Sequence, residues 1–207
     1  FGRCIVHFAV DDQRIAMTTE LKGKKGMAKE SWFLPFDQGW NDGAGNPPNA
    51  EGLKTDYLWK KILTPHSLTD IIENYAQITE EEDRKTGRKK FKQIFPRYHQ
   101  LDAVRKVLAD VEEKGAGQRY LIQHSAGSGK SNSIAWLAHQ LIGVRHKGKE
   151  AFDSIIVVTD RRLLDRQLRE TIKGFAQVGS VIGAVKEGGG KSKTEQLSKF
   201  LREGKKI

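Results

Sequence analysis

A glycine-rich segment in the middle of the chain restricts the folds that this sequence can adopt. Residues 124–131 have the sequence HSAGSGKS and lie between an apolar stretch at 120–123 and an amphipathic stretch at 132–141. The first stretch is predicted to be a strand and the second a helix. A glycine-rich turn between a strand and a helix directs backbone N–H groups to one point, and the helix N-terminus adds partial positive charge there. The sequence therefore predicts a phosphate-binding loop in an α/β fold.

The side chains of this loop suit a nucleoside triphosphate. Lys130 would reach the β- and γ-phosphates and is the predicted catalytic residue, while the hydroxyl of Ser131 would bind Mg²⁺. The strict pattern has a glycine at its first position, where this chain has His124. That difference leaves the core of the loop intact and favours helicase-type loops over the commonest nucleotide-binding proteins. The loop residues expected to bind ATP are Ala126, Gly127, Ser128, Gly129, Lys130 and Ser131.

Strand-like and helix-like patterns alternate around the loop. Residues 155–159 are rich in β-branched side chains, as is usual for a parallel strand covered on both faces, and residues 180–185 form a further candidate strand. Residues 95–207 are therefore expected to form a doubly wound parallel sheet. Apolar residues three and four positions apart predict its other helices at 101–111, 164–172 and 194–201.

The region before residue 79 has a different pattern. Residues 3–10 and 15–19 are β-prone and flank a polar turn, so they predict a hairpin. Two helices are expected after a loop rich in Gly, Asn and Pro, the first at 57–63 and the second with Ser67 as its N-cap. This mixture of strands and helices is typical of an α+β unit.

A charged segment separates the two regions. Four acidic residues at 80–83 are followed by six basic residues, and almost no apolar residue precedes Phe91. We interpret residues 79–94 as a solvated linker between domains, and a dedicated DNA-binding patch is the alternative. The predicted organisation is therefore 1–78, 79–94 and 95–207.

Charge and cysteine content narrow the class of protein. The 207 residues carry a formal net charge of +10, which favours a polyanionic partner because Lys and Arg placed on phosphates release condensed counterions. Cys4 is the one cysteine, which excludes an internal disulfide and a zinc knuckle and is typical of a reducing cytosol. No apolar run reaches the roughly 18–20 residues that cross a bilayer, so no membrane association is expected. The chain lacks an initiator Met and a signal-peptide pattern, and we expect it to be cut from a longer protein.

Several longer motifs of the chain resemble those of one known family. Three of them are residues 95–104 (FPRYHQLDAV), 120–133 and 157–162 (VVTDRR). They are similar to the opening motifs of the motor in the R subunits of type I restriction endonucleases. Segments further upstream are similar to the region that joins its nuclease and motor domains; they are residues 6–11, 17–19, 33–36 and 43–49. The resemblance covers nearly the whole chain.

The resemblance implies a fold and an activity. R subunits of this family have a nuclease domain followed by two RecA-like motor domains of the superfamily 2 helicase type. The motor pulls double-stranded DNA at the expense of ATP before the DNA is cut, in the restriction of foreign DNA. The chain would then hold an α+β C-terminal portion of the nuclease domain and the first part of a P-loop, RecA-like motor domain with a doubly wound parallel sheet. The implied cofactors are ATP and Mg²⁺, the implied partners are double-stranded DNA and the modification and specificity subunits, and the implied location is the bacterial cytoplasm.

The same resemblance implies roles in ATP binding for residues near position 100. Gln100 would recognise adenine through a bidentate amide contact with N6 and N7 of the base. Arg97, Phe95 or Tyr98 would pack on the plane of the base. A polar residue at the start of a helix is the alternative for Gln100.

The motif after the strand at 155–159 acquires a role in DNA binding. Asp160, Arg161 and Arg162 would lie near the DNA backbone in this family. That role suits arginine, whose forked donors hold phosphate oxygens. A solvated first helical turn is the alternative for the two arginines.

A short acidic pattern near the N-terminus imitates a nuclease centre. Asp11 or Asp12, together with Glu20 and Lys22, could hold Mg²⁺ beside an attacking water. Such short patterns often arise by chance, and the related subunits have their cluster further upstream. We therefore expect these residues to have no catalytic role.

Some parts of an ATPase of this type are not found in the sequence. No Asp-Glu-x-His string follows the loop, and the arginine fingers would come from a second motor domain. The chain is therefore expected to bind ATP weakly or not at all and to hydrolyse none. Two alternatives remain: another superfamily 2 DNA helicase or repair ATPase, and a non-catalytic DNA-docking or assembly module with a vestigial loop.

Overall fold

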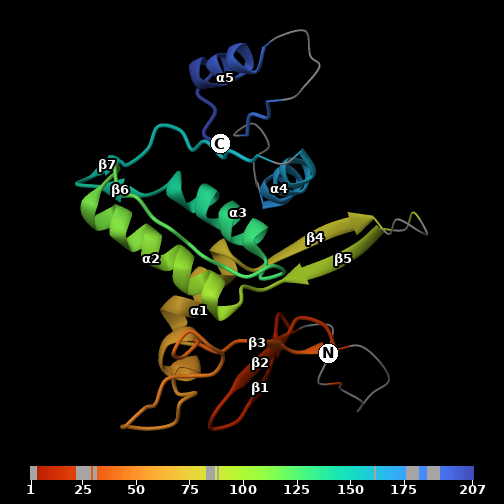
Figure 1. Cartoon of the computed structure of the whole chain (residues 1–207), viewed down its shortest axis with the longest axis vertical. Coiled ribbons are helices and arrows are strands. Elements are labelled where there is room, and N and C mark those ends of the chain that lie inside the picture. The colour runs from red at the N-terminus through yellow and green to blue at the C-terminus, as the bar shows by residue number, and fades with distance from the viewer. Residues whose placement is uncertain are drawn as a thin grey trace. The chain divides into compact units, whose positions relative to one another are not determined.

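The chain divides into two compact units, Phe1–Leu101 and Asp102–Ile207. The computed structural model describes residues 4–21, 29, 32–82, 87, 89–160, 162–175, 182–185 and 192–207. Figure 1 shows the helices and strands of both units, and the boundary between the units falls inside helix α2 (Tyr98–Lys114). Over the described ranges, no helix is both long enough and apolar enough to cross a membrane.

The first unit begins with a three-stranded antiparallel sheet. Its strands are adjacent in the order β1 (His7–Val10), β2 (Ile15–Thr18) and β3 (Leu34–Pro35). The predicted N-terminal hairpin is therefore confirmed. Along β2, Ile15 and Met17 are buried, so this strand supplies the apolar side chains beneath the sheet.

An aspartate fixes the turn between β1 and β2. The Asp11 carboxylate accepts hydrogen bonds from the backbone N–H groups of Gln13 and Arg14, both at 2.7 Å. An aspartate that binds the backbone two and three residues ahead of itself replaces the bonds that the turn leaves open. The same two bonds lower the pKa of the Asp11 carboxyl, because they stabilise its charged form.

Asn46 holds the loop after β3 against the start of β2. Its amide oxygen accepts a hydrogen bond from the Gln38 N–H, and its amide nitrogen donates to the carbonyl of Gln13 and to the Asp37 carboxylate, all at 2.9 Å. Asp37 in turn accepts a bond from the Ile15 N–H at 2.8 Å. A buried amide with these partners replaces regular secondary structure in this part of the chain.

Two helical elements follow the loop. The π-helical turn η2 (Leu58–Ile62) precedes α1 (Pro65–Asn74). The sequence predicts Ser67 as the cap of α1, but the helix begins earlier, and the Thr64 hydroxyl accepts a bond from the Ser67 N–H. Proline causes this difference, because Pro65 has its φ angle fixed near the helical value and lacks the N–H that a first helical residue would leave unsatisfied.

Aromatic rings fill the centre of the first unit. Phe36 lies in edge-to-face contact with Phe8 at 5.2 Å and with Tyr98 at 6.0 Å between ring centroids. Tyr57 contacts Tyr98 at 5.2 Å, and its hydroxyl donates to the Phe36 carbonyl at 2.8 Å. Burial raises the pKa of the Tyr57 phenol, so this donor keeps its proton. Phe95 completes the cluster against Phe8 and Phe36.

The segment interpreted as a solvated linker forms a two-stranded antiparallel ribbon over its described residues. Strand β4 (Gln77–Glu82) pairs with β5 (Lys89–Ile94), from Gln77 opposite Ile94 to Glu82 opposite Lys89. The register places an acidic strand beside a basic one. Opposite charges across a ladder stabilise the pairing, so this charged composition is compatible with strands.

Helices dominate the second unit. Helix α2 continues into it, and α3 (Lys130–Leu141), α4 (Arg162–Phe175) and α5 (Lys193–Arg202) follow. Two short strands, β6 (Arg145–His146) and β7 (Lys149–Glu150), form a small hairpin after α3. Ser192 and Glu195 cap α5 reciprocally in a capping box.

Helices α3 and α4 pack on each other. The rings of Trp136 and Phe175 are stacked with centroids 5.7 Å apart and planes 4° from parallel. Nearby, the Nε2 atom of His139 lies 2.8 Å from the carbonyl oxygen of Ile172. These contacts hold together two helices that the sequence places on either side of a predicted strand.

The predicted parallel sheet is not seen among the described residues. Every strand pair there is antiparallel, and residues 120–123 and 155–159, which the sequence predicts to be strands, form none. Leu121 is 92% exposed and Val158 85% exposed. A strand requires a paired neighbour and covered faces, so β-branched composition alone does not form one. For the expected strand at 180–185, only residues 182–185 are described, and they also form none.

Single backbone hydrogen bonds join residues 205–207 to two segments that the sequence predicts as strands. The Lys206 carbonyl accepts a bond from the Ile155 N–H, and the Ile207 carbonyl accepts one from the Gly183 N–H, both at 2.7 Å. The Ser154 hydroxyl also donates to the Lys205 carbonyl at 2.9 Å. Three separate bonds connect these segments without making a regular ladder.

Replacing Asn46 tests how the first unit depends on its buried amide. Asn46→Ala leaves the Gln38 N–H and the Gln13 carbonyl without this partner, and it should lower the free energy of unfolding by about 1–3 kcal/mol. Urea denaturation followed by tryptophan fluorescence measures the change. The matched control is Asn74→Ala, because Asn74 donates to Asp70 on the exposed side of α1. A loss no larger than that of the control would contradict the role given to Asn46.

Candidate functional site

The phosphate loop enters helix α3 through two left-handed glycines. Gly127 has φ 74° and Gly129 has φ 82°, and Gly129 is the N-cap of α3, whose first residue is Lys130. Residues other than glycine rarely adopt this conformation, because their Cβ atom would lie too close to the following carbonyl oxygen. The two glycines therefore provide the turn that places the loop at the N-terminus of a helix, as the sequence predicts.

Lys130 bends back over its own loop. Its ammonium group donates to the carbonyl oxygens of Ser125 at 2.8 Å and His124 at 3.1 Å. Sequence reasoning does not identify these two partners, because every residue has a backbone carbonyl. The lysine is exposed, so a charged oxygen from solution can replace the neutral carbonyls.

His124 occupies the position where the strict loop pattern has glycine. Burial lowers the pKa of its imidazole, and the positive charge of Lys130 lowers it further. The neutral ring is therefore favoured at neutral pH. The loop gains bulk at this position without a second positive charge.

The residues of the loop fit the ATP and Mg²⁺ that the sequence predicts. Ser131 lies in the first turn of α3 and is half-buried, directly after the lysine. The helix N-terminus, one lysine and one hydroxyl provide an anion site with an oxygen donor beside it. Over the described residues, no group of three His, Cys, Asp or Glu side chains could hold a metal ion.

The residues expected to bind adenine lie in the first unit. Gln100 is 2% exposed, and its amide oxygen accepts a bond from the Arg97 N–H at 2.9 Å. Gln100 is thus the third residue of α2 reaching back to the residue before the helix, which is one half of a capping box. The observed contact of Gln100 matches the alternative interpretation, that of a polar residue at the start of a helix.

Of the three residues considered for the plane of the base, two belong to the aromatic cluster. Phe95 and Tyr98 pack against Phe36 in the core of the first unit. Arg97 lies outside this cluster, and its partial burial lowers the pKa of the guanidinium group without removing its charge.

The expected DNA-binding motif is described only in part. Asp160 is exposed, and α4 begins at Arg162. Arg161 and the side chain of Arg162 lie outside the described residues. Their contact with DNA remains a prediction.

The acidic pattern near the N-terminus does not form a metal site. Asp11 lies at the turn of the β1–β2 hairpin, and the register that pairs His7 with Thr18 places Glu20 at the other end. Strand β2 ends at Thr18, four positions after Arg14, which is roughly 13 Å at about 3.3 Å per residue, and Glu20 lies two residues further on. Asp11 and Glu20 are therefore at opposite ends of the strand, and Lys22 lies outside the described residues.

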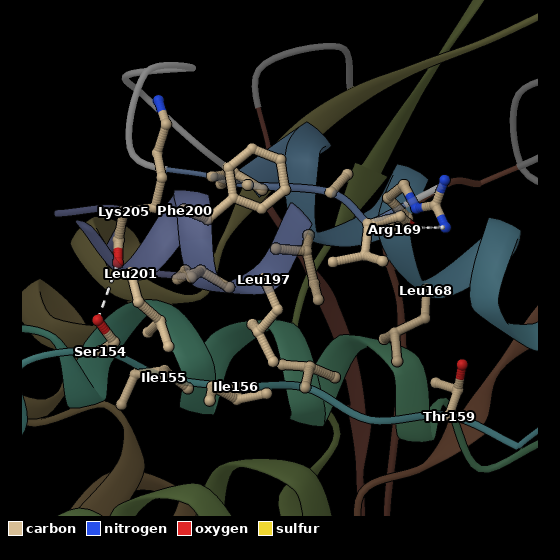
Figure 2. Close-up of a pocket in the computed structure, with 17 residues that line it drawn as sticks. Ser154, Ile155, Ile156, Thr159, Leu168, Arg169, Leu197, Phe200, Leu201 and Lys205 are labelled. Carbon is tan, nitrogen blue, oxygen red and sulfur yellow. Dashed lines mark hydrogen bonds between the residues drawn. The ribbon is translucent and has the colours of Figure 1, made fainter. Parts of the chain in front are cut away.

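The second unit contains a cavity that, unlike the phosphate loop, is lined mainly by aliphatic side chains. Figure 2 shows this space of about 150 Å³, with aliphatic side chains from residues 154–159, α4 and α5 around it. The Phe200 ring closes over Gly183, where a Cβ would lie 2.8 Å from the ring. Arg169 points along one side and donates to a carbonyl, that of Val185, at 3.4 Å. No residue of the phosphate loop lines the cavity. We therefore interpret it as a space left between packed core side chains.

One family model matches the part of the chain that holds this loop. A glycine-rich loop with Gly-Lys-Ser at the start of a helix is typical of nucleotide-binding proteins, and here the helix follows the loop but residues 120–123 before it form no strand. The family model described as SWI2/SNF2 ATPase matches residues 99–207, which is more than half of the chain. The chain therefore belongs to the SWI2/SNF2 ATPase family and is a helicase-like ATPase of superfamily 2. No curated protein and no solved structure matches it.

Gly127 provides a test of the loop conformation. No atom would lie within 4 Å of a Cβ at Gly127, so Gly127→Ala should cost stability only through its positive φ, by about 1 kcal/mol. Gly174→Ala is the matched control, because Gly174 lies in α4 with equally open surroundings. In a helix the same substitution should stabilise by about 0.5–1 kcal/mol. Denaturation midpoints of the two variants should therefore shift in opposite directions, and equal shifts would contradict the left-handed turn.

Proposed function

We propose that the chain is part of the R subunit of a type I restriction enzyme, with the ATP-binding loop of a motor that translocates double-stranded DNA before cleavage. The observation that supports ATP binding is the position of Lys130 at the start of α3, behind two left-handed glycines. The resemblance of the sequence upstream of the motor supports the assignment to the R subunit.

The loop would bind the triphosphate by exchanging hydrogen-bond partners. The Lys130 ammonium would leave the carbonyls of His124 and Ser125 for phosphate oxygens, which are charged and therefore stronger acceptors. The N-terminal N–H groups of α3 would point at the same oxygens. Ser131 would hold Mg²⁺, which would supply charge neutralisation at the β- and γ-phosphates.

Gln100 would recognise adenine, as the resemblance implies. Its amide oxygen, which accepts a bond from the Arg97 N–H, would accept from the N6 amino group of the base. The amide nitrogen would donate to N7. Arg97 would lie on the plane of the base, since Phe95 and Tyr98 belong to the aromatic cluster.

The DNA partner and the assembly follow from the family resemblance. Asp160, Arg161 and Arg162 would lie at the DNA backbone, and the net charge of +10 favours such a polyanion. The modification and specificity subunits would be the protein partners. The family match favours a second candidate, a DNA-remodelling or repair ATPase, but such a protein has no need of the segments at 6–11 and 43–49 that resemble the R subunit.

Hydrogen exchange with and without ATP tests the nucleotide site. Because the chain is expected to bind ATP weakly, the nucleotide and Mg²⁺ are supplied in large excess. They should slow amide exchange in residues 127–131, since the loop N–H groups would bind phosphate oxygens. Lys130→Ala should abolish this protection. Lys106→Ala is the matched control, since Lys106 forms an exposed ion pair with Asp102 on α2 and should leave the protection intact. The same exchange rates in the loop with and without ATP would overturn the proposed function.

A further inference from the structure

The segment that leads into the phosphate loop is exposed along its whole length. Residues 116–123 lie on the surface and form neither a helix nor a strand. Leu121, within this segment, is 92% exposed. A segment that buries so little apolar surface gains little from packing, so its path depends on individual polar contacts.

Two glycines reverse the chain between helix α2 and this segment. Gly115 has φ 79° and Gly117 has φ 104°, conformations that favour glycine. A Cβ atom at Gly115 would lie 3.0 Å from the His146 ring, so the chain is closely packed where the helix ends. The reversal brings Tyr120 back beside Asp110, ten positions earlier in the sequence.

A hydrogen bond ties the segment to α2 at this point. The Tyr120 hydroxyl donates to one carboxylate oxygen of Asp110 at 2.8 Å. The other carboxylate oxygen of Asp110 pairs with the Lys114 ammonium, one helical turn further along α2. The two partners of Asp110 therefore use different oxygen atoms, and either can be removed without the other.

The bond between Tyr120 and Asp110 joins a neutral donor to a charged acceptor. The bond from Lys114, and then the one from Tyr120, lower the pKa of the Asp110 carboxyl. Desolvation raises the pKa of the Tyr120 phenol, and the bond to Asp110 raises it further. At neutral pH the phenol therefore keeps its proton and the carboxylate its charge, which makes the hydrogen bond stronger than one between neutral groups.

The residues that follow the segment support the lysine of the phosphate loop. The Lys130 ammonium rests on the carbonyl oxygens of His124 and Ser125, the first two residues after position 123. These carbonyls move with the segment if it moves. The place where Tyr120 is held therefore influences the geometry of the loop.

We propose that Asp110 and Tyr120 are positioning residues for the phosphate loop, because they fix the segment from which the loop starts. The inference rests on the proposed binding of ATP. Helix α3, whose first residue is Lys130, holds the other end of the loop. With both ends held, the loop loses less conformational entropy when its N–H groups bind phosphate oxygens. Both residues act through the loop and not on the nucleotide itself.

The first test needs no nucleotide. Backbone order parameters from NMR relaxation of the full chain should be near about 0.85 in residues 118–124, as for rigid backbone. Tyr120→Phe removes one oxygen atom and should lower them below about 0.6, the range of flexible backbone. Asp110→Ala should have the same effect. The double variant should match either single variant, because both substitutions remove one contact.

The second test measures the affinity for a fluorescent ATP analogue, titrated with Mg²⁺ to large excess. Tyr120→Phe should weaken binding about fivefold, as expected for the loss of one exposed hydrogen bond to a charged group. Asp110→Asn should restore most of the affinity that Asp110→Ala loses, because its amide oxygen still accepts a bond from Tyr120. A role in stability alone would shift the denaturation midpoint and leave this affinity unchanged.

Lys114→Ala is the matched control. It removes the exposed ion pair with Asp110 and leaves the bond to Tyr120, so the order parameters and the affinity should both stay nearly unchanged. Equal effects of Lys114→Ala and Tyr120→Phe would overturn the proposal, as would unchanged order parameters in Tyr120→Phe. If the unmodified chain does not bind the analogue at all, the proposed function fails, whereas the order parameters still decide whether the pair holds the segment.

Discussion

The left-handed backbone at Gly127 and Gly129 is the constraint on which the second unit depends. It turns the chain from the loop into α3, so that the helix N-terminus and the Lys130 ammonium face the same space. Further along the same helix, Trp136 stacks on Phe175 of α4. One turn therefore leads from the candidate phosphate site into the helix that packs on α4, and a side chain at either glycine would strain that turn through its positive φ.

Hydrogen bonds from a few polar side chains organise the first unit in a comparable way. Asp11 fixes the turn of the β1–β2 hairpin. Asn46 connects the loop after β3 to Gln13, just before β2. Both act on backbone groups that no sheet or helix satisfies, and buried groups of that kind must find partners. The aromatic cluster around Phe36 can then form beneath a loop that lacks regular structure.

The proposed ATP binding by this helicase-like ATPase rests on two independent grounds. One is loop geometry, with Lys130 at the start of α3 behind two left-handed glycines. The other is the resemblance to R subunits of type I restriction enzymes.

The sequence by itself determined the glycine turn before α3, the helix after it and the N-terminal hairpin, because each depends on local preferences: glycine at positive φ, helical periodicity, and a polar turn between β-prone runs. It was wrong about the cap of α1. The sequence assigned residues 79–94 to a solvated linker, but strands β4 and β5 pair within this segment. Cross-strand charge pairing cannot be recognised until the register is known.

The parallel sheet predicted from residues 120–123 and 155–159 is not seen among the described residues, because strands exist only through neighbours that local sequence does not specify. Tertiary structure alone decided that Gln100 caps α2 and that Lys130 rests on two carbonyls, since backbone partners carry no signature in the amino-acid sequence.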